Sequence, residues 1–534
     1  MNIDEHWCKT MKKSKGRRSV LETIAVLLCF LTFPLFHPAL AGAQETIEQA
    51  LLSIRQATGY DVLQQWNEGL YVEASGEYLG LPSAFQMYFL PQGLFRTEIT
   101  SDLTLIEGFD GQRGWMVDET GMPGHLELMA LEQSQLMAWT TGGFWLDPKC
   151  PLNKDLYPWS ESDSVIVFSL LFPSGILTAT MTIDSRSFLP QRCVWKTFGQ
   201  ENYIAFDRYE DGGGFLFPGE ISFSVESYET RLETQMVRLS DSALEHLCVP
   251  VTTRPQDTRF VPGKKGSVEL KKISSGHLAV RPLVNGQDFG WFLLDTGAGR
   301  SVLDRSIADR LGMEVIAESP AMGFGGLVTV RYRRGQLLTL GPLEIDEPTF
   351  LGIDLAPLAG AFGCDIAGIL GYDLFMRCLV ELDVQSDSLL LFEPGTWGAR
   401  EADWQEIIFN RNAPTLSCSF SGDHTALFDL DTGFPGMVTF NRAFAAKHGL
   451  FDEQESEAFT AGGVGGNVEM VTAQLEWLEL HGHRWENLAI SIAGEAHGVL
   501  SDESVAGLVG TGLLASYRTL IDYPNKRIAF EEKK

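Results

Sequence analysis

The chain is long, acidic and rich in apolar residues. It has 534 residues, a formal net charge of −29 at pH 7 and 44% hydrophobic residues. Because domains usually contain roughly 100 to 200 residues, we expect three folded units with substantial cores. An acidic surface of this size repels phosphate groups, which argues against nucleic acid and anionic membrane surfaces as partners.

The N-terminus has the three parts of a secretory signal peptide. An apolar run, IAVLLCFLTFPLF, is followed by ALAGA, whose Ala41 and Ala43 occupy the positions that a signal peptidase reads. The basic residues before the run are Lys12, Lys13, Lys15, Arg17 and Arg18. We predict that residues 1–43 are removed before Gln44 and that the protein is exported, to the periplasm or beyond the cell. An uncleaved anchor is the alternative, but the run is short for a membrane span and proline interrupts it.

Residues 44–250 are predicted to be mainly β. Short alternating runs such as LYVEASGEY and FLFPGEISFSVESYE are separated by Gly, Pro and Asp turns. Two helices are expected, TIEQALLSIRQAT at 46–58 and LELMALEQSQLMAWT at 126–140. The apolar stretch 165–183 has a central Pro-Ser-Gly, which predicts a buried β-hairpin rather than a membrane helix.

Within this region the stretch TLIEGFDGQRGWMVDETG at 104–121 resembles bacterial lipoprotein-carrier-like half-barrels. In those proteins a curved antiparallel sheet wraps a helix, so the resemblance implies an antiparallel half-barrel (α+β) domain with an apolar cavity for a lipid or lipoprotein. The plainer interpretation is that Trp115, Trp139 and Trp145 simply belong to a core.

Residues 251–266 are predicted to form a linker. The sequence VPVTTRPQDTRFVPGKKG at 249–266 is rich in Pro, Thr and charged residues and has neither helical nor strand periodicity. We accordingly expect residues 44–250 to fold separately and to be dispensable for the chemistry of the C-terminal half.

The C-terminal half contains an internal repeat. WFLLDTGAGRSVLDRSIADRLGM at 291–313 aligns with ALFDLDTGFPGMVTFNRAFAAKHGL at 426–450 as apolar strand, DTG turn, short strand and amphipathic helix. The landmark pairs, offset by 136 to 140 residues, are Asp295 with Asp431, Gly326 with Gly466, Gly371 with Gly510 and Asp383 with Asp522. We predict two β lobes, 267–395 and 396–534.

Each repeat carries one Asp-Thr-Gly directly after an apolar strand, at Asp295 and at Asp431. Two carboxylates a few ångströms apart cannot both ionise cheaply, so such a pair holds one proton near working pH. One carboxylate then acts as base on a water while the other polarises the scissile carbonyl, without a metal or a cofactor. Glycine at Gly297 and Gly433 lets backbone N–H groups approach the carboxylates.

The paired DTG motifs resemble the retropepsin-like aspartic peptidases, duplicated in one chain as in the bilobed pepsin-like enzymes. The resemblance covers about residues 267–534 and implies a mainly β, bilobed acid-protease fold of two tandem β-barrel lobes. It implies that Asp295 and Asp431 are catalytic and that Thr296 and Thr432 hydrogen-bond across the lobes. The residues implied to thread behind the DTG loops are Leu370, Gly371, Val509 and Gly510. The residues implied to form a flap over the substrate are Gly325, Gly326, Gly465 and Gly466.

Both motifs depart from that family after the DTG. The family usually has Ala and then Ser or Thr, whereas Ala298-Gly299 and Phe434-Pro435 follow here. Neither lobe directly supplies the usual hydroxyl, although Ser301 is close by. The second lobe could be a degenerate partner, and the plainer alternative is that both aspartates only cap strand-to-turn junctions.

The motifs together predict an aspartic endopeptidase of the cell envelope that hydrolyses an extended polypeptide as a monomer. The rival hypothesis is a catalytically silent protein that binds a peptide or lipoprotein in the same cleft. Asp295 and Asp431 carboxyl groups within hydrogen-bonding reach would favour the enzyme. His481 and His483 lack a third ligand in register, so no metal site is predicted, and the six cysteines after residue 43 leave the disulfide pairing open.

Overall fold

The computed structural model describes residues 38–65, 69–158, 164–240, 244–397, 402–451, 456–494 and 498–532. The chain divides into two compact units, Met1–Leu52 and Ser53–Lys534. Most of the predicted signal peptide lies outside the described residues, and its last six residues, 38–43, begin helix α2 (Pro38–Thr58). Among the helices of these ranges, none has the length and apolarity needed to cross a membrane.

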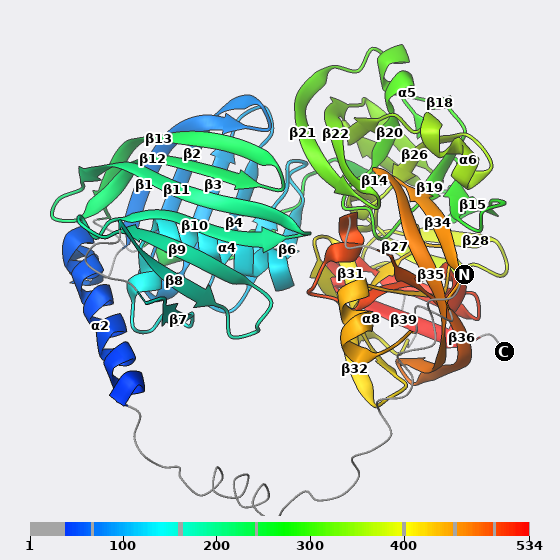
Figure 1. Cartoon of the computed structure of the whole chain (residues 1–534). Helices are drawn as coiled ribbons and strands as arrows, with labels where there is room; N and C mark the ends of the chain where they lie inside the picture. Colours follow the sequence, from blue (N-terminus) through cyan, green and yellow to red (C-terminus); the bar gives the residue numbers. More distant parts are fainter. Residues whose placement is uncertain are drawn as a thin grey trace, which may run out of the picture. The chain divides into compact units, whose positions relative to one another are not determined.

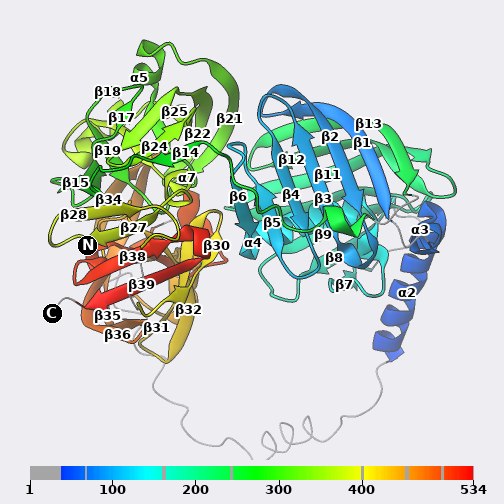
Figure 2. The same cartoon turned by 180° about the vertical axis from the view of Figure 1, so that it is seen from behind.

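Within Ser53–Lys534, the first part is a half-barrel made of one 13-stranded antiparallel sheet that curves around helix α4 (Leu128–Thr141), as Figures 1 and 2 show. Strands β1 to β6 form one half of a meander and β7 to β13 the other, and the two halves join where β1 pairs with β13. The first six strands are β1 (Leu70–Tyr78), β2 (Leu81–Phe89), β3 (Phe95–Thr100), β4 (Leu105–Phe109), β5 (Gly114–Val117) and β6 (Pro123–Leu126). The remaining seven are β7 (Asn153–Leu156), β8 (Val165–Leu171), β9 (Thr178–Asp184), β10 (Pro190–Thr197), β11 (Gln200–Asp211), β12 (Leu216–Val225) and β13 (Tyr228–Leu239).

The half-barrel bears out the local predictions. The hairpin expected at 165–183 is confirmed, because β8 and β9 pair antiparallel and bury alternate residues. The expected second helix is α4, and the first is α2, which begins eight residues earlier than predicted. Trp115, Trp139 and Trp145 are all buried in the core, as the plainer interpretation expected.

The segment predicted as a linker is attached to the first lobe over part of its length. Strand β14 (Thr258–Phe260) pairs with β24 (Leu343–Asp346), and Arg259 of β14 forms ion pairs with Glu344 and Asp346 of β24. The lack of periodicity misled the prediction because a three-residue edge strand is too short to show alternation. The half-barrel and both predicted lobes lie within the unit Ser53–Lys534.

The described residues of the C-terminal half form three sheets, of 5, 13 and 8 strands. The 13-stranded sheet includes strands from both repeats, since β27 (Leu379–Asp383) pairs with β38 (Tyr517–Asp522). Further strands of the first repeat are β15 (Ser267–Lys272), β16 (Leu278–Val280), β17 (Leu283–Val284), β18 (Gln287–Asp288), β19 (Trp291–Leu294), β20 (Val302–Asp304), β21 (Val315–Gly323), β22 (Gly326–Arg334), β23 (Leu337–Leu340), β25 (Thr349–Ile353), β26 (Ile366–Leu370) and β28 (Ser388–Phe392). Those of the second are β29 (Gln405–Glu406), β30 (Ile408–Asn410), β31 (Ala413–Phe420), β32 (His424–Asp431), β33 (Val438–Phe440), β34 (Ala458–Gly463), β35 (Gly466–Leu480), β36 (His483–Ala493), β37 (Gly507–Gly510) and β39 (Arg527–Glu532).

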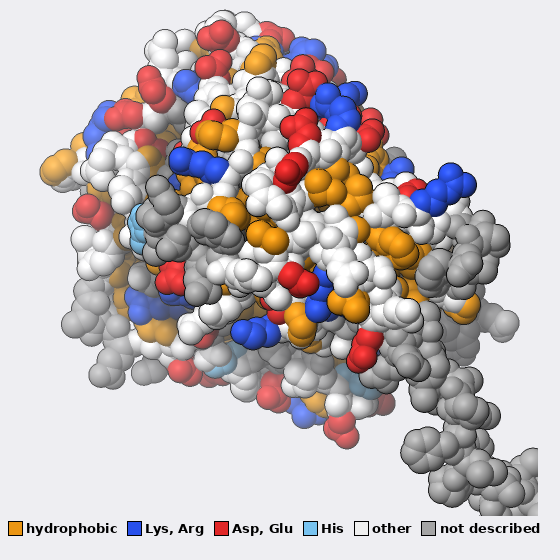
Figure 3. Space-filling model, turned by 90° about the vertical axis from the view of Figure 1, so that its left-hand side faces the viewer, with side chains coloured by type: hydrophobic (Ala, Val, Ile, Leu, Met, Phe, Trp, Pro, Cys, Tyr) orange, Lys and Arg blue, Asp and Glu red, His pale blue; other side chains and the backbone are white. Residues whose placement is uncertain are grey.

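The repeated strand, DTG turn, strand and helix pattern is confirmed in both repeats. The short helices are α5 (Arg305–Arg310) and α8 (Arg442–His448), each following its short strand β20 or β33. One large buried cluster joins the lobes and includes Phe292 and Leu370 of the first, Phe409 and Leu430 of the second, and Met122 of the half-barrel. The six cysteines of the described chain are free thiols. On the face drawn in Figure 3, acidic and basic side chains are interspersed.

Candidate active site

The two DTG loops begin where parallel strand pairs end. Strand β19 runs parallel to β26, with Leu294 opposite Leu370, and β32 runs parallel to β37, with Asp431 opposite Gly510. The Asp295 N–H donates to the Leu370 carbonyl at 3.0 Å. The structure therefore places the predicted threading residues directly beside each loop, with Val509 opposite Leu430 in the second lobe.

Two threonines join the loops by reciprocal hydrogen bonds. The Thr296 N–H donates to Thr432 Oγ1 and the Thr432 N–H donates to Thr296 Oγ1, both at 2.9 Å. The hydroxyls in turn donate across the lobes, Thr296 to the Leu430 carbonyl at 2.7 Å and Thr432 to the Leu294 carbonyl at 2.8 Å. Four hydrogen bonds between fully buried groups thus fix the two loops face to face.

The glycines of the two motifs bring each loop against the opposite carboxyl group. A Cβ added at Gly297 would lie 2.6 Å from Asp431 Cγ, and one added at Gly433 would lie 2.5 Å from Asp295 Cγ. No side chain fits at such distances, so glycine is required by the approach of the neighbouring carboxyl. The aspartates of the two repeats therefore lie together at one site.

The two carboxyl groups are held unequally. Asp295 Oδ1 accepts N–H groups from Gly297 at 2.8 Å and from Ala298 at 3.0 Å, whereas Asp431 Oδ1 accepts one, from Gly433 at 2.7 Å. Burial holds the pKa of Asp295 above its ordinary value, and its hydrogen bonds, including one with Asp431, offset only part of that rise. Burial, the charge of Asp295 and the hydrogen bond with Asp295 all raise the pKa of Asp431, which stays well above its ordinary value.

The residues that follow the DTG motifs explain the departures seen in the sequence. The Ser301 hydroxyl accepts the Gly371 N–H at 3.1 Å and also bonds the Asp373 carboxylate, so it supports the threading element. In the second loop the Phe434 N–H donates to the Asp431 carbonyl at 3.1 Å, and Pro435 has no N–H to offer. This difference accounts for the single backbone donor to the Asp431 carboxyl.

Three residues near the site carried no signal in the sequence. Tyr523 is fully buried, donates from its hydroxyl to the Thr296 carbonyl at 3.3 Å, and lies within electrostatic reach of both aspartates. Burial lowers the pKa of His277 to about 4, although a hydrogen bond with the Gly433 backbone opposes the shift. Burial and the charge of Asp502 raise the pKa of Asp429 to about 8. Asp429 lies within the aligned repeat and Tyr523 directly follows the landmark Asp522, but a sequence does not show that these side chains are buried beside the aspartates, because tertiary packing decides it.

The glycine-rich hairpins meet at their tips. The Gly325 N–H, between β21 and β22, donates to the Val464 carbonyl at 2.9 Å, between β34 and β35. A Cβ at Gly465 would lie 2.4 Å from the Gly326 carbonyl oxygen, and one at Gly325 would lie 2.5 Å from the Gly466 nitrogen. The four glycines predicted as flap residues are thus in mutual contact, and their role in closing over a substrate stays a prediction.

The tips also exchange side chains between the lobes. Phe324 packs against a cluster of the second lobe that includes Val468, Met470 and Leu508. Val464 packs against a cluster that includes Val330 and Ile353 of the first lobe. Separation of the tips would therefore expose apolar surface on both lobes. Within the ranges that the structure describes, no group of three or more His, Cys, Asp or Glu side chains is placed to hold a metal ion.

Removing the Thr432 hydroxyl should destabilise the fold more than removing a comparable buried hydroxyl elsewhere. Thr432→Val leaves the Thr296 N–H and the Leu294 carbonyl without partners, at a cost of about 2–4 kcal/mol in the free energy of unfolding. Thr439→Val is the matched control, because that buried hydroxyl bonds one side-chain hydroxyl, of Ser491. Urea unfolding at one pH measures the free energy of unfolding of both variants. Equal losses would show that the threonine bonds between the loops stabilise the fold no more than an ordinary buried hydroxyl does.

Comparison with known proteins adds one family match and several structural likenesses. Residues 280–374 match the family described as aspartyl protease, a segment that contains Asp295 and Leu370-Gly371. No curated protein is significantly similar to the chain in sequence. The fold and the match together define a mainly β chain with an aspartyl-protease-like segment.

Three solved structures are similar to parts of the chain. A DUF1329 family protein from Desulfovibrio piger is 14% identical, with a TM-score of 0.27, over 36% of this chain and 92% of its own. A LolA superfamily protein from Nitrosomonas europaea is 13% identical, with a TM-score of 0.27, over 36% of this chain and 97% of its own. A retropepsin-like aspartic protease from Rickettsia conorii is 21% identical, with a TM-score of 0.18, over 22% of this chain and 91% of its own.

Proposed function

We propose that this protein is an aspartic-type endopeptidase of the cell envelope, exported by the N-terminal signal and active as a monomer. Asp295 and Asp431 activate one water for hydrolysis of an extended polypeptide. The observation that carries the proposal is the mutual contact of the DTG loops, in which the glycine of each motif lies against the carboxyl group of the other and the threonines bond reciprocally. The match of residues 280–374 to aspartyl proteases supports the same reaction class.

The unequal surroundings of the two carboxyls support different roles for them. Asp431, with the higher pKa, holds the shared proton and donates a hydrogen bond to the scissile carbonyl oxygen. Asp295 is stabilised as an anion by two backbone N–H groups and takes a proton from the attacking water. The proton passed to Asp295 is then available for the leaving amine.

The pH dependence follows from the direction of these shifts. Because its pKa is raised, Asp431 stays protonated at a pH where an ordinary aspartate is ionised, and activity is lost as the pH rises through that raised pKa. On the acid side activity falls when Asp295 is protonated, so the profile belongs to the pair. A mature chain beginning at Gln44, assayed on an unfolded polypeptide from acid to alkaline pH, measures this profile. A folded chain with no turnover at any pH would favour a silent binding protein.

A second function, lipid or lipoprotein binding, is favoured by a cavity of about 450 Å³ that is lined mainly by the half-barrel and also by Ser319, Pro320, Tyr332 and Arg411 of the C-terminal half. Its lining is largely apolar and includes Phe85, Ile99, Met137 and Phe223. The half-buried Glu107 also faces it, accepts a hydrogen bond from the Ser134 hydroxyl at 2.9 Å, and has a pKa raised by desolvation. The volume lies in the usual range for ligand pockets, roughly 300–1,000 Å³.

Filling this cavity should abolish binding of an apolar ligand. Met137→Trp places a larger side chain in the cavity, and we expect loss of binding of a fluorescent fatty acid, measured by titration. Met236→Trp is the matched control, because Met236 lies on strand β13 and is exposed. Unchanged binding in Met137→Trp would place the fatty acid elsewhere.

A further inference from the structure

Arg300 lies five residues after Asp295 and is buried together with its ion-pair partners. Its guanidinium contacts Asp118 Oδ2 at 3.1 Å and also Glu119 Oε2, and the three side chains are 11%, 2% and 9% exposed. Both carboxylates belong to the half-barrel turn between β5 and β6, far from Arg300 in the sequence. The first DTG loop is therefore tied to the half-barrel through a buried ion-pair cluster, Arg300 with Asp118 and Glu119.

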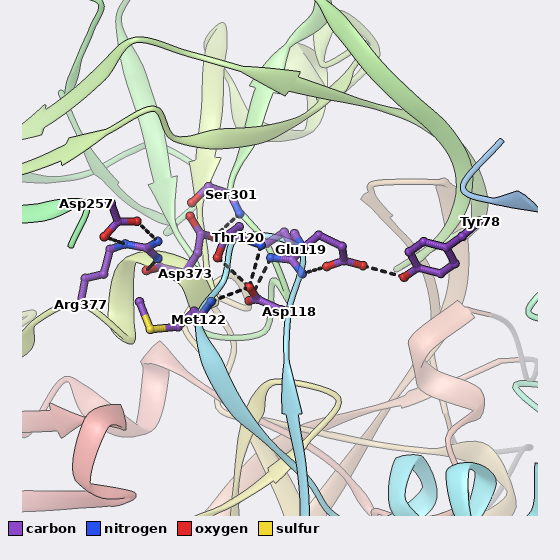
Figure 4. A network of polar contacts seen from close by, with 10 residues as sticks. Tyr78, Asp118, Glu119, Thr120, Met122, Asp257, Ser301, Asp373 and Arg377 are labelled. Carbon is purple, nitrogen blue, oxygen red and sulfur yellow. Dashed lines mark hydrogen bonds and ion pairs between the residues drawn. The ribbon is translucent and has the colours of Figure 1, made fainter. Parts of the chain in front are cut away.

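The half-barrel turn is built to hold these carboxylates in place, as Figure 4 shows. Asp118 Oδ1 accepts the Thr120 N–H at 2.8 Å, the Thr120 hydroxyl at 2.6 Å and the Met122 N–H at 3.1 Å. Glu119 Oε1 accepts the Tyr78 hydroxyl at 2.8 Å. Burial opposes ionisation of Asp118, but Arg300 and the Thr120 bonds outweigh it and leave the pKa of Asp118 below its ordinary value.

The backbone around Arg300 transmits this anchoring to the catalytic loop. A Cβ at Gly371 would lie 2.8 Å from the Arg300 carbonyl oxygen, and the Tyr372 N–H donates to the Ala298 carbonyl at 2.9 Å. The Ser301 N–H donates to Asp373 Oδ1 at 2.6 Å. Ala298, inside this braced segment, supplies one of the two N–H groups that Asp295 accepts.

The second loop has no such cluster. Gly436 stands where the repeat aligns with Arg300, and its carbonyl accepts the Gly512 N–H at 3.0 Å. The chain is therefore asymmetric at this point, and the extra charge of the first repeat has its ion-pair partners in the half-barrel.

We propose that Arg300 is a positioning residue of the peptidase site, held by Asp118 and Glu119, so that the half-barrel turn completes the first DTG loop. Only the kinetic test of this inference rests on the proposed function. Arg300 touches no reacting atom, and it acts by fixing the direction of the N–H groups that bind Asp295.

The test uses the full mature chain with Glu119→Gln, Arg300→Lys and Arg300→Met. Glu119→Gln keeps the shape and removes one charge, and we expect kcat to fall at least about tenfold with KM nearly unchanged, since small misplacements in a site are costly. Arg300→Lys should retain more activity than Arg300→Met, because lysine keeps the charge but not the planar fork. Glu220→Gln is the matched control, since Glu220 is similarly buried and pairs with Arg208 at 3.0 Å within the half-barrel.

Hydrogen exchange distinguishes a local effect on the first DTG loop from a general loss of stability. It does so even if the protein proves not to be a peptidase. In Glu119→Gln we expect faster exchange in peptides covering 295–301 and unchanged exchange in those covering 431–436, whether or not the wild type cleaves peptides. Equal acceleration in both loops would reduce the cluster to a structural role and overturn the proposal. Wild-type exchange together with wild-type kcat in folded Glu119→Gln and Arg300→Met chains would overturn it as well.

Discussion

An Asp431→Asn chain should lose at least about a hundredfold in kcat while remaining folded, because acid–base groups of this kind contribute roughly 10²–10⁴. Asparagine preserves the shape and the Gly433 N–H contact but cannot hold the titrating proton that the pair shares. Asp295→Asn should be equally damaging, since the two carboxyls act as one unit. Turnover measured on a polypeptide substrate at the optimum pH checks both.

Two controls make the result specific. Asp346→Asn removes an exposed carboxylate from strand β24 and should leave kcat unchanged. Sedimentation should show each variant to be monomeric, because a dimer could draw its second carboxylate from another copy of the first lobe. Undiminished turnover in monomeric Asp431→Asn would mean that the second lobe only shapes the cleft.

A chain that begins near Val261 should not fold stably, contrary to the expectation drawn from the sequence that residues 44–250 are dispensable. The truncation removes Met122 from the core shared by the lobes and leaves buried Arg300 without its ion-pair partners. It also removes Asp257, which pairs with Arg377, a guanidinium only 4% exposed. Each buried charge left unpaired costs about 3–5 kcal/mol, a large share of a typical total of roughly 5–15 kcal/mol.

Circular dichroism and tryptophan fluorescence during heating measure this loss. The comparison is the mature chain from Gln44, and addition of a separate fragment 44–250 should restore part of the cooperative transition. A truncated chain that is soluble, melts cooperatively and cleaves peptides at the full rate would show that the half-barrel is an independent attachment. That outcome would also contradict the role proposed for Arg300.

Much of the site followed from the sequence because its signals are local and duplicated. The DTG turns at Asp295 and Asp431, the threading glycines Gly371 and Gly510 and the hairpin at 165–183 could be read from short runs of residues. The apolar strand before each turn and the matched offsets sufficed to align the repeats. Close contact between the loops followed from chemistry, since an aspartate pair works only at short range.

The remaining features depend on contacts between distant segments, which no periodicity records. Arg300 and Asp118 are 182 residues apart in the chain, and Tyr523 reaches the Thr296 carbonyl across 227 residues. A buried arginine and an exposed one look the same in a sequence, and burial decides whether its partner is essential. The sequence by itself determined the two repeats and their paired aspartates, whereas the tertiary structure decided which half-barrel residues support them, because only packing sets the partners of a buried charge.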